Sequence, residues 1–234
     1  MKRCGYILLW LGGLLALTAS RTDLRAQSAY PAQWGVAEAD LKALLRDGDL
    51  LFETPREKNR ITSVTQAEGS LPTDHVGVYF RGYIWEAIPA GVVQTPLTDF
   101  LERNRVEGTD GRLGLMLGRV EAPYSLRKTM KRIRALAGKP YDDLYLPGDS
   151  AIYCSELVQT CFVTKRGRLV LEAVPMTFRD ETGEIPEVWQ LLYARHGMRV
   201  PEGRPGSNPA ELSRRAALRI LLPQAPAKPA EDIP

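Results

Sequence analysis

Apolar and polar residues follow helix and strand spacing along most of the chain. Alternating positions predict two strands, His75–Phe80 and Tyr83–Ile88, on either side of Arg81 and Gly82. Short apolar runs predict further strands at Leu50–Phe52, Leu113–Val120 and Leu169–Val174. Apolar spacing of about three to four residues predicts helices over Val36–Leu45, Leu97–Asn104, Leu126–Ala137, Cys154–Phe162 and Val188–His196. We find no internal repeat in the sequence, so the pattern indicates one globular domain.

The two central strands predict a hairpin with a defined register. A two-residue turn at Arg81-Gly82 pairs Gly77 with Glu86 and puts His75 and Glu86 on the same face. Glu86 is then a diagonal neighbour of His75, within reach of its side chain. We expect Gly77 to leave room there for the imidazole ring.

The first apolar run differs from those that follow. Gly5–Ala19 comes after Lys2 and Arg3 and is 15 residues long, shorter than the roughly 20 residues that span a bilayer. A short apolar run after a basic start is typical of a secretory signal peptide. We therefore predict export and no stable membrane span after cleavage; a permanent anchor is the alternative.

Cleavage changes the charge of the working protein. Leu24-Arg25-Ala26 places cleavage after Ala26, and cleavage near Ala19 or Ser20 is the alternative. The whole chain has 31 basic and 28 acidic residues, a formal charge of +3. Removing residues 1–26 takes away four basic residues and one acidic residue and leaves 27 of each. A neutral mature chain gives no support to nucleic-acid binding.

The other end of the chain is rich in proline. Residues 201–234 contain 7 of the 17 prolines. We predict a short helix over Glu211–Leu222 and disorder from Pro223. The predicted organisation is a signal peptide at 1–26, one folded domain at 27–210 and a tail at 211–234.

Two cysteines remain after export. Cys154 and Cys161 lie on one predicted helix about 10.5 Å apart, too far for a disulfide, which needs Cα atoms within about 7 Å. Cys161 is typical of a small buried hydrophobe. Cys154 begins the helix, where the helix dipole and free backbone N–H groups favour a thiolate and can stabilise an oxyanion. A buried cysteine without a catalytic role is the alternative.

A thiolate nucleophile needs a general base, and the chain has two histidines. His196 ends a helix, where a cation suits the helix dipole. His75 lies beside Glu86 in the predicted hairpin, so Glu86 can orient its ring as the third member of a triad. Cys154, His75 and Glu86 are therefore the candidate catalytic residues, with a surface histidine and an exposed strand glutamate as the alternatives.

Other chemistries find little support in the sequence. One cysteine and one histidine within range make a poor zinc site, so no metal is predicted. The sequence contains no Gly-rich phosphate loop, HExxH or GxSxG motif, and we predict no cofactor.

Five short motifs in this order resemble the YiiX-like family of bacterial cysteine hydrolases. They are Gly48-Asp49-Leu50-Leu51-Phe52, Asp74-His75-Val76-Gly77-Val78, Glu86-Ala87, Tyr141-Asp142 and Tyr153-Cys154-Ser155-Glu156-Leu157, and the resemblance covers about residues 47–210. That family has a circularly permuted papain-like fold and is related to the NlpC-type cell-wall peptidases. The resemblance implies an α+β fold in which a small antiparallel sheet carrying His75 and Glu86 packs against the helix that Cys154 begins.

The resemblance also implies a function. We expect a periplasmic or secreted cysteine hydrolase that cleaves an amide bond, with peptidoglycan peptides as the first substrate, through an acyl-enzyme. A lipid or other ester acyl hydrolase or acyltransferase is one alternative, and a non-catalytic envelope binding module is another. The partner is accordingly a cell-wall peptide or an acyl lipid. We expect a specificity pocket to be lined from Thr54–Thr73 and Leu144–Ser150.

Overall fold

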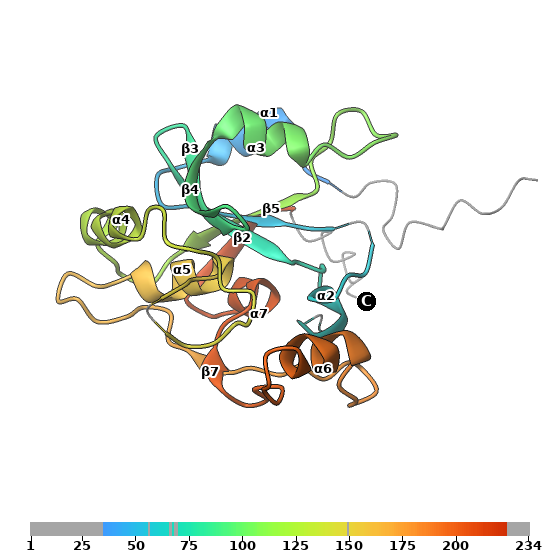
Figure 1. The fold of residues 1–234 in the computed structure, drawn as a ribbon. Coiled ribbons are helices and arrows are strands. Elements are labelled where there is room, and N and C mark those ends of the chain that lie inside the picture. The colour runs from blue at the N-terminus through green and yellow to red at the C-terminus, as the bar shows by residue number, and fades with distance from the viewer. Residues whose placement is uncertain (1–34, 56, 66, 68–69, 149, 224–234) are drawn as a thin grey trace, which may run out of the picture.

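A six-stranded antiparallel sheet is the centre of the computed structural model, which describes residues 35–55, 57–65, 67, 70–148 and 150–223 (Figure 1). The predicted signal peptide and the chain from residue 224 lie outside the described residues. The strand order is β4-β3-β2-β1-β5-β8. Its strands are β1 Leu50–Glu53, β2 His75–Phe80, β3 Tyr83–Ile88, β4 Gly91–Pro96, β5 Leu115–Val120 and β8 Leu218–Leu222. A separate pair joins β6 Val174–Pro175 to β7 Pro205–Gly206.

Helices cover both faces of this sheet. They are α1 Glu38–Leu44, α2 Thr62–Thr65, α3 Leu97–Arg103, α4 Leu126–Ala135, α5 Cys154–Cys161, α6 Glu187–Ala194 and α7 Pro209–Ser213. Figure 1 shows α1 and α3 on one side of the sheet and α4, α5 and α7 on the other. The predicted α+β fold, with a sheet packed against the helix that begins at Cys154, is confirmed. No helix in the described ranges is long and apolar enough to cross a bilayer.

Three apolar clusters hold these layers together. The first joins Val76 and Val78 of β2 to Leu157 and Val158 of α5. The second fills the opposite face of the sheet, where side chains of β1, β3 and β5 pack against α1 and α3. The third lies beyond the sheet and is rich in aromatic residues from α6 and the loops around it. Helix α5 is thus held firmly, because seven of its eight residues are buried.

The hairpin of β2 and β3 has the predicted register. Phe80 pairs with Tyr83, and the turn residues Arg81 and Gly82 have positive φ angles of 49° and 84°, as a tight two-residue hairpin turn requires. The space beside Gly77 is used differently from the prediction. A Cβ atom at Gly77 would collide with a methyl group of Ile84, so the glycine admits Ile84 rather than the imidazole ring.

Two predicted elements need correction, and one strand was missed. The predicted strand at Leu169–Val174 is wrong, because Leu169 forms only an isolated bridge and a strand begins at Val174. The missed strand is β4. The helix over Glu211–Leu222 is wrong beyond Ser213, because Asn208 caps the short α7 and the chain then extends into β8.

The position of β8 also corrects the predicted domain boundary. Leu218–Leu222 pairs with β5 at the edge of the central sheet. Its end residues Leu218 and Leu222 are each only 8% exposed. Residues 211–222, assigned to the tail, therefore belong to the folded domain, and the boundary at residue 210 is wrong.

Candidate active site

The predicted nucleophile Cys154 is the first residue of α5. Its side chain is 3% exposed, and Tyr153 is the N-cap of the helix. Cys154 and Cys161 are both free thiols, as predicted, since they lie at opposite ends of the helix. Burial raises the pKa of Cys161 to about 11, so this thiol is inert at neutral pH.

The structure brings His75 and Glu86 together. His75 Nε2 lies 2.7 Å from Glu86 Oε2. The His75 side chain is 15% exposed, whereas that of Glu86 is fully buried. Cys154 interacts with the same ring, since its charge and a hydrogen-bonding interaction both raise the pKa of His75. Because Glu86 engages Nε2, Nδ1 is the ring nitrogen left to face the sulfur.

This arrangement changes the protonation of His75. Burial alone would lower its pKa, since a buried imidazolium loses its hydration. The charge of Cys154 and the hydrogen bonds to Cys154 and Glu86 outweigh burial and raise the pKa of His75 well above its ordinary value. His75 therefore favours the imidazolium form at neutral pH, which stabilises a thiolate next to it.

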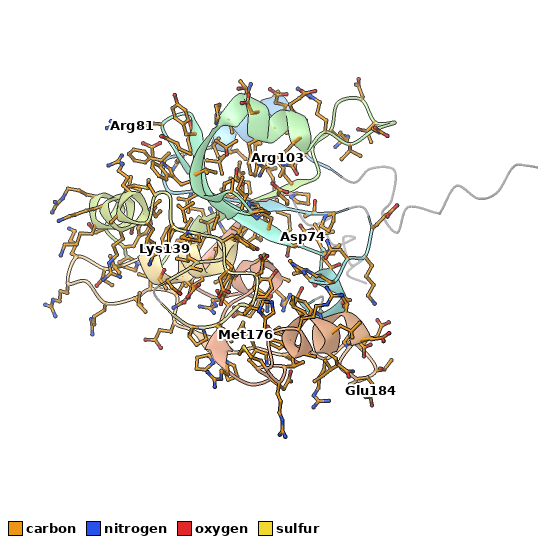
Figure 2. The ribbon with its side chains drawn as sticks, in the orientation of Figure 1. Asp74, Arg81, Arg103, Lys139, Met176 and Glu184 are labelled. Atoms are coloured by element: carbon orange, nitrogen blue, oxygen red, sulfur yellow. The ribbon has the colours of Figure 1, made fainter. Side chains whose placement is uncertain are left out.

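Glu86 is held as an anion by partners that the sequence did not reveal. Arg103 Nη1 and Nη2 donate to its two carboxylate oxygens at 2.9 and 2.5 Å, and Thr95 Oγ1 donates at 2.5 Å. Burial would raise the pKa of Glu86, but the hydrogen bonds from His75 and Arg103 lower it to about 2. Arg103 is the last residue of α3 (Figure 2), and its guanidinium also binds Glu53.

Three acidic and imidazole side chains of this site could in principle hold a metal ion. Glu53, His75 and Glu86 place possible ligand atoms within 4.8 Å of one another. The guanidinium of Arg103 already hydrogen-bonds both carboxylates. A divalent cation would have to displace Arg103, so these residues do not fit a resident metal ion.

Tyr141 and Tyr145 were not assigned as site residues from the sequence. Burial and then the charge of Cys154 raise the pKa of Tyr141, so its hydroxyl stays protonated at neutral pH. A hydrogen-bonding interaction between Tyr141 and Tyr145 raises the pKa of Tyr141 and lowers that of Tyr145, and Arg60 donates to the Tyr145 hydroxyl at 3.5 Å. Tyr145 has a positive φ of 52°, a strained backbone conformation that is most often found at functional sites.

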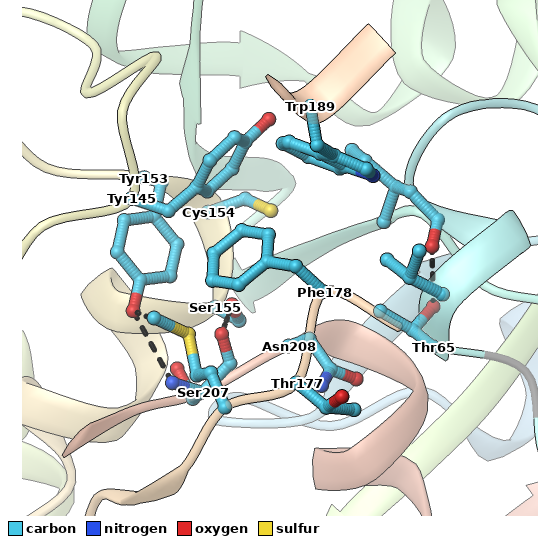
Figure 3. Close-up of a pocket in the computed structure, with 13 residues that line it drawn as sticks. Thr65, Tyr145, Tyr153, Cys154, Ser155, Thr177, Phe178, Trp189, Ser207 and Asn208 are labelled. Carbon is cyan, nitrogen blue, oxygen red and sulfur yellow. Dashed lines mark hydrogen bonds between the residues drawn. The ribbon is translucent and has the colours of Figure 1, made fainter. Parts of the chain in front are cut away.

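A pocket opens beside Cys154 (Figure 3). Ile61, Val64, Thr65 and Tyr145 come from the two segments that were expected to line it. The remaining walls come mostly from residues 176–178, from Trp189 and from residues 207–208, which the sequence did not indicate. In the sequence these wall residues share only that most of them are aromatic or small polar residues and lie after α5.

Comparisons with known proteins agree with this architecture. Residues 44–222 match the model of a family described as permuted papain-like amidase enzymes, YaeF/YiiX, C92 family. The uncharacterized protein YiiX of Escherichia coli strain K12 is 28% identical over 166 residues, which are 66% of this chain and 74% of that protein. A crystal structure titled metalloprotein yiiX, from Escherichia coli O157:H7, matches with a TM-score of 0.58 and 22% identity over 77% of this chain and 98% of that one. The predicted resemblance and fold are thus confirmed.

We expect the imidazole of His75 to stay protonated well above the ordinary histidine pKa of about 6.5. Replacing Cys154→Ala removes the sulfur that raises the pKa of His75, so this pKa should fall; Cys161→Ala is the matched control and should not change it. Titration of the imidazole protons by NMR measures this, with His196→Gln to assign the two histidine signals. An identical His75 titration in wild type and Cys154→Ala would contradict the coupling.

We expect Arg103→Ala to lower the free energy of unfolding by about 2 kcal/mol or more at pH 7, because Glu86 stays buried with less compensation. Since the pKa of Glu86 is lowered from 4.5 to about 2, its stabilisation is present above pH 4.5 and is lost as the pH falls toward 2. The difference between the two proteins should therefore shrink at pH 3. Urea denaturation at both pH values measures it.

Arg105→Ala is the matched control, because Arg105 forms exposed ion pairs with Glu38 and Glu102. Because exposed ion pairs are screened by solvent, its loss should change the free energy of unfolding less than the loss of Arg103 does. An effect of Arg103→Ala no larger than that of Arg105→Ala would show that Arg103 does not stabilise the buried carboxylate.

Proposed function

The chain belongs to the family of permuted papain-like amidases of the YaeF/YiiX type, and from this we propose that it is a cysteine amidase with Cys154 as nucleophile, His75 as general base and acid, and Glu86 as the orienting carboxylate. The observation that carries the proposal is the contact of one imidazole ring with both other groups. His75 Nε2 lies 2.7 Å from Glu86 Oε2, and the charge and hydrogen-bonding interaction of Cys154 raise the pKa of the same ring. This is the connectivity of a nucleophile–base–acid triad.

In the first half of the reaction, the thiolate of Cys154 attacks the carbonyl carbon of the amide. The imidazolium of His75 then donates its proton to the leaving nitrogen, and the C–N bond breaks. The products are an amine and a thioester between Cys154 and the acyl group. The raised pKa of His75 supports this step, because the proton is present before the substrate arrives.

In the second half, water hydrolyses the thioester. Neutral His75 takes a proton from the water as its oxygen attacks the thioester carbon. The C–S bond breaks, the acid is released, and the thiolate–imidazolium pair is restored. Glu86, with its pKa of about 2, stays ionised throughout and keeps the ring in place.

The tetrahedral oxyanion needs hydrogen-bond donors close to the sulfur. The backbone N–H of Cys154, in the first turn of α5, is one donor in our proposal. The hydroxyl of Tyr141 is the second. The interaction of the two tyrosines raises the pKa of Tyr141 and lowers that of Tyr145, so Tyr141 is the donor before substrate binds. In our proposal the Tyr141 proton turns to the oxyanion, and Tyr145, which accepts from Arg60, donates to Tyr141 instead.

An amide in a peptidoglycan peptide is the first substrate that we propose. The family description supports an amide over an ester. The signal-like sequence of residues 1–26 supports delivery to the periplasm or the outside of the cell, where the cell wall lies. Hydrolysis or transfer of a lipid acyl group remains the alternative for the same site.

We expect wild-type protein to hydrolyse muropeptides and Cys154→Ala to lose that turnover. Cys161→Ala is the matched control and should remain active, because its thiol is not part of the site. His75→Ala should abolish turnover, and Glu86→Gln should lower kcat less, because it removes only the orienting charge. Amine release from muropeptides and fatty-acid release from acyl lipids measure the two substrate classes.

Each result of that experiment distinguishes the hypotheses. Turnover of lipids alone would favour the ester alternative. No turnover of either substrate, or equal turnover by wild type and Cys154→Ala, would favour a non-catalytic binding module. Unchanged activity in His75→Ala would reject its role as the base.

We expect Tyr141→Phe to lower kcat about 100-fold with little change in KM, because an oxyanion donor acts in the transition state. Tyr124→Phe is the matched control, since Tyr124 is a partly buried tyrosine that packs on Phe162. Steady-state kinetics of both variants measure the difference. Equal kcat values for wild type and Tyr141→Phe would reject the second oxyanion donor.

A further inference from the structure

The pocket beside Cys154, called here the inner pocket, has rigid apolar walls. Figure 3 shows Cys154, Phe178 and Trp189 around it. The ring of Phe178 packs edge to face against Trp189 at 5.1 Å between centroids. Tyr145 packs in the same way against Trp189 at 5.7 Å. These contacts hold the three rings against one another and form the aromatic side of the pocket.

The inner pocket is small. Its cavity volume is about 40 Å³. One water-sized group needs at least about 10–15 Å³ on this scale, so the pocket has room for about three such groups. The side chains of alanine, serine, threonine and valine meet that limit. Those of leucine, phenylalanine and lysine exceed it, as does a long alkyl chain.

One buried polar atom in the inner pocket has no partner. Ser207 is 2% exposed, and its Oγ atom forms no hydrogen bond with any residue that the structure describes. Its backbone is fixed, because Tyr153 Oη and Ser207 N are hydrogen-bonded at 3.2 Å and Ser155 Oγ donates to Ser207 O at 3.1 Å. A buried hydroxyl without a partner is costly unless a ligand supplies one. Apart from Cys154, whose charge in the proposed mechanism is balanced by His75, none of the described residues that line this pocket carries a charge, so that ligand group is neutral.

A second cavity, called here the outer groove, adjoins the inner pocket. The two share Val64, Thr65 and Thr177 as wall residues. The outer groove has a volume of about 640 Å³ and contains charged residues of both signs, among them Lys58, Arg179, Asp180, Glu181 and Arg214. Such a surface suits a polar chain with its own charges and amides, and it does not suit an alkyl chain.

We propose that the inner pocket binds the side chain of the residue whose carbonyl Cys154 attacks, and that it selects a small neutral side chain, with Ser207 Oγ as its one polar contact. The rest of the acyl part lies in the outer groove and is a peptide, not a long-chain acyl group. The proposal rests on the proposed function for the identity of the attacked carbonyl. The selection itself depends only on the size and chemistry of the pocket.

Binding to Cys154→Ser tests the selection without turnover, since serine keeps the pocket close to its original size. The ligands are acetyl-Gly-Gly-X-amides with X as Ala, Thr, Leu, Phe or Lys, together with dodecanamide. NMR titration should show that the Ala and Thr peptides bind at least about tenfold more tightly than the other peptides. Binding of dodecanamide should be absent. Equal or tighter binding of the Leu, Phe or Lys peptide, or of dodecanamide, would overturn the proposal.

Two variants of Cys154→Ser locate the selection in the inner pocket. Val64→Ala widens the pocket and should narrow the difference between the Leu and Ala peptides to a few-fold; Val188→Ala on the exposed face of α6 is its matched control. Ser207→Ala should weaken the Thr peptide several-fold and leave the Ala peptide unchanged, whereas Ser213→Ala should change neither. Equal effects of a variant and its control would place the selection elsewhere and overturn the proposal.

The same peptides separate this proposal from the proposed function. Ammonia release by wild-type protein measures amide hydrolysis of each peptide. Turnover of all five peptides at similar kcat/KM would keep the amidase and overturn the selective pocket. Selective binding by Cys154→Ser without any turnover by wild type would keep the pocket and overturn the amidase.

Discussion

The candidate site depends on the hydrogen bonds that hold the buried carboxylate of Glu86. A carboxylate without hydration is costly inside a protein unless hydrogen bonds replace the lost water. Here His75, Arg103 and Thr95 provide those bonds from β2, α3 and β4. The three bonds therefore hold three elements, β2, α3 and β4, in place around the charge of Glu86. The position of the imidazole follows from this, because a ring that left Glu86 would remove one of the bonds that make its burial tolerable.

The thiol reaches this charged cluster through apolar packing. Helix α5 buries Leu157 and Val158 against Val76 and Val78, which belong to the same strand as His75. The strand thus carries two kinds of contact, apolar ones to the nucleophile's helix and a polar one to Glu86. Close-packed interiors resist small displacements, so the distance between thiol and imidazole is set by the core rather than by a flexible loop.

Local interactions explain what the sequence could predict. The hairpin register follows from a two-residue turn and strand alternation, and His75 and Glu86 are only 11 positions apart in the sequence, so their contact could be predicted. Cys154 was accessible because a helix start changes the chemistry of a thiol. The contact of Arg103 with Glu86 could not be predicted. The placement of α3, which ends at Arg103, depends on the preceding strand β4, and the mixed sequence of Gly91–Pro96 has no clear alternation. The inner pocket was inaccessible for a similar reason, because its walls come from segments far apart in the chain.

The pairing of β5 with β8 has a topological consequence. The segment between these strands contains Cys154, Tyr141 and most of the walls of the inner pocket, and both of its ends are joined in one ladder of hydrogen bonds. Cys154 therefore lies on a segment that is closed into a loop by β8. Closing so long a loop has an entropic cost that only non-local pairing offsets. The position of Cys154 relative to His75 thus depends also on β8, the last described strand, because its pairing with β5 closes the segment that carries the thiol.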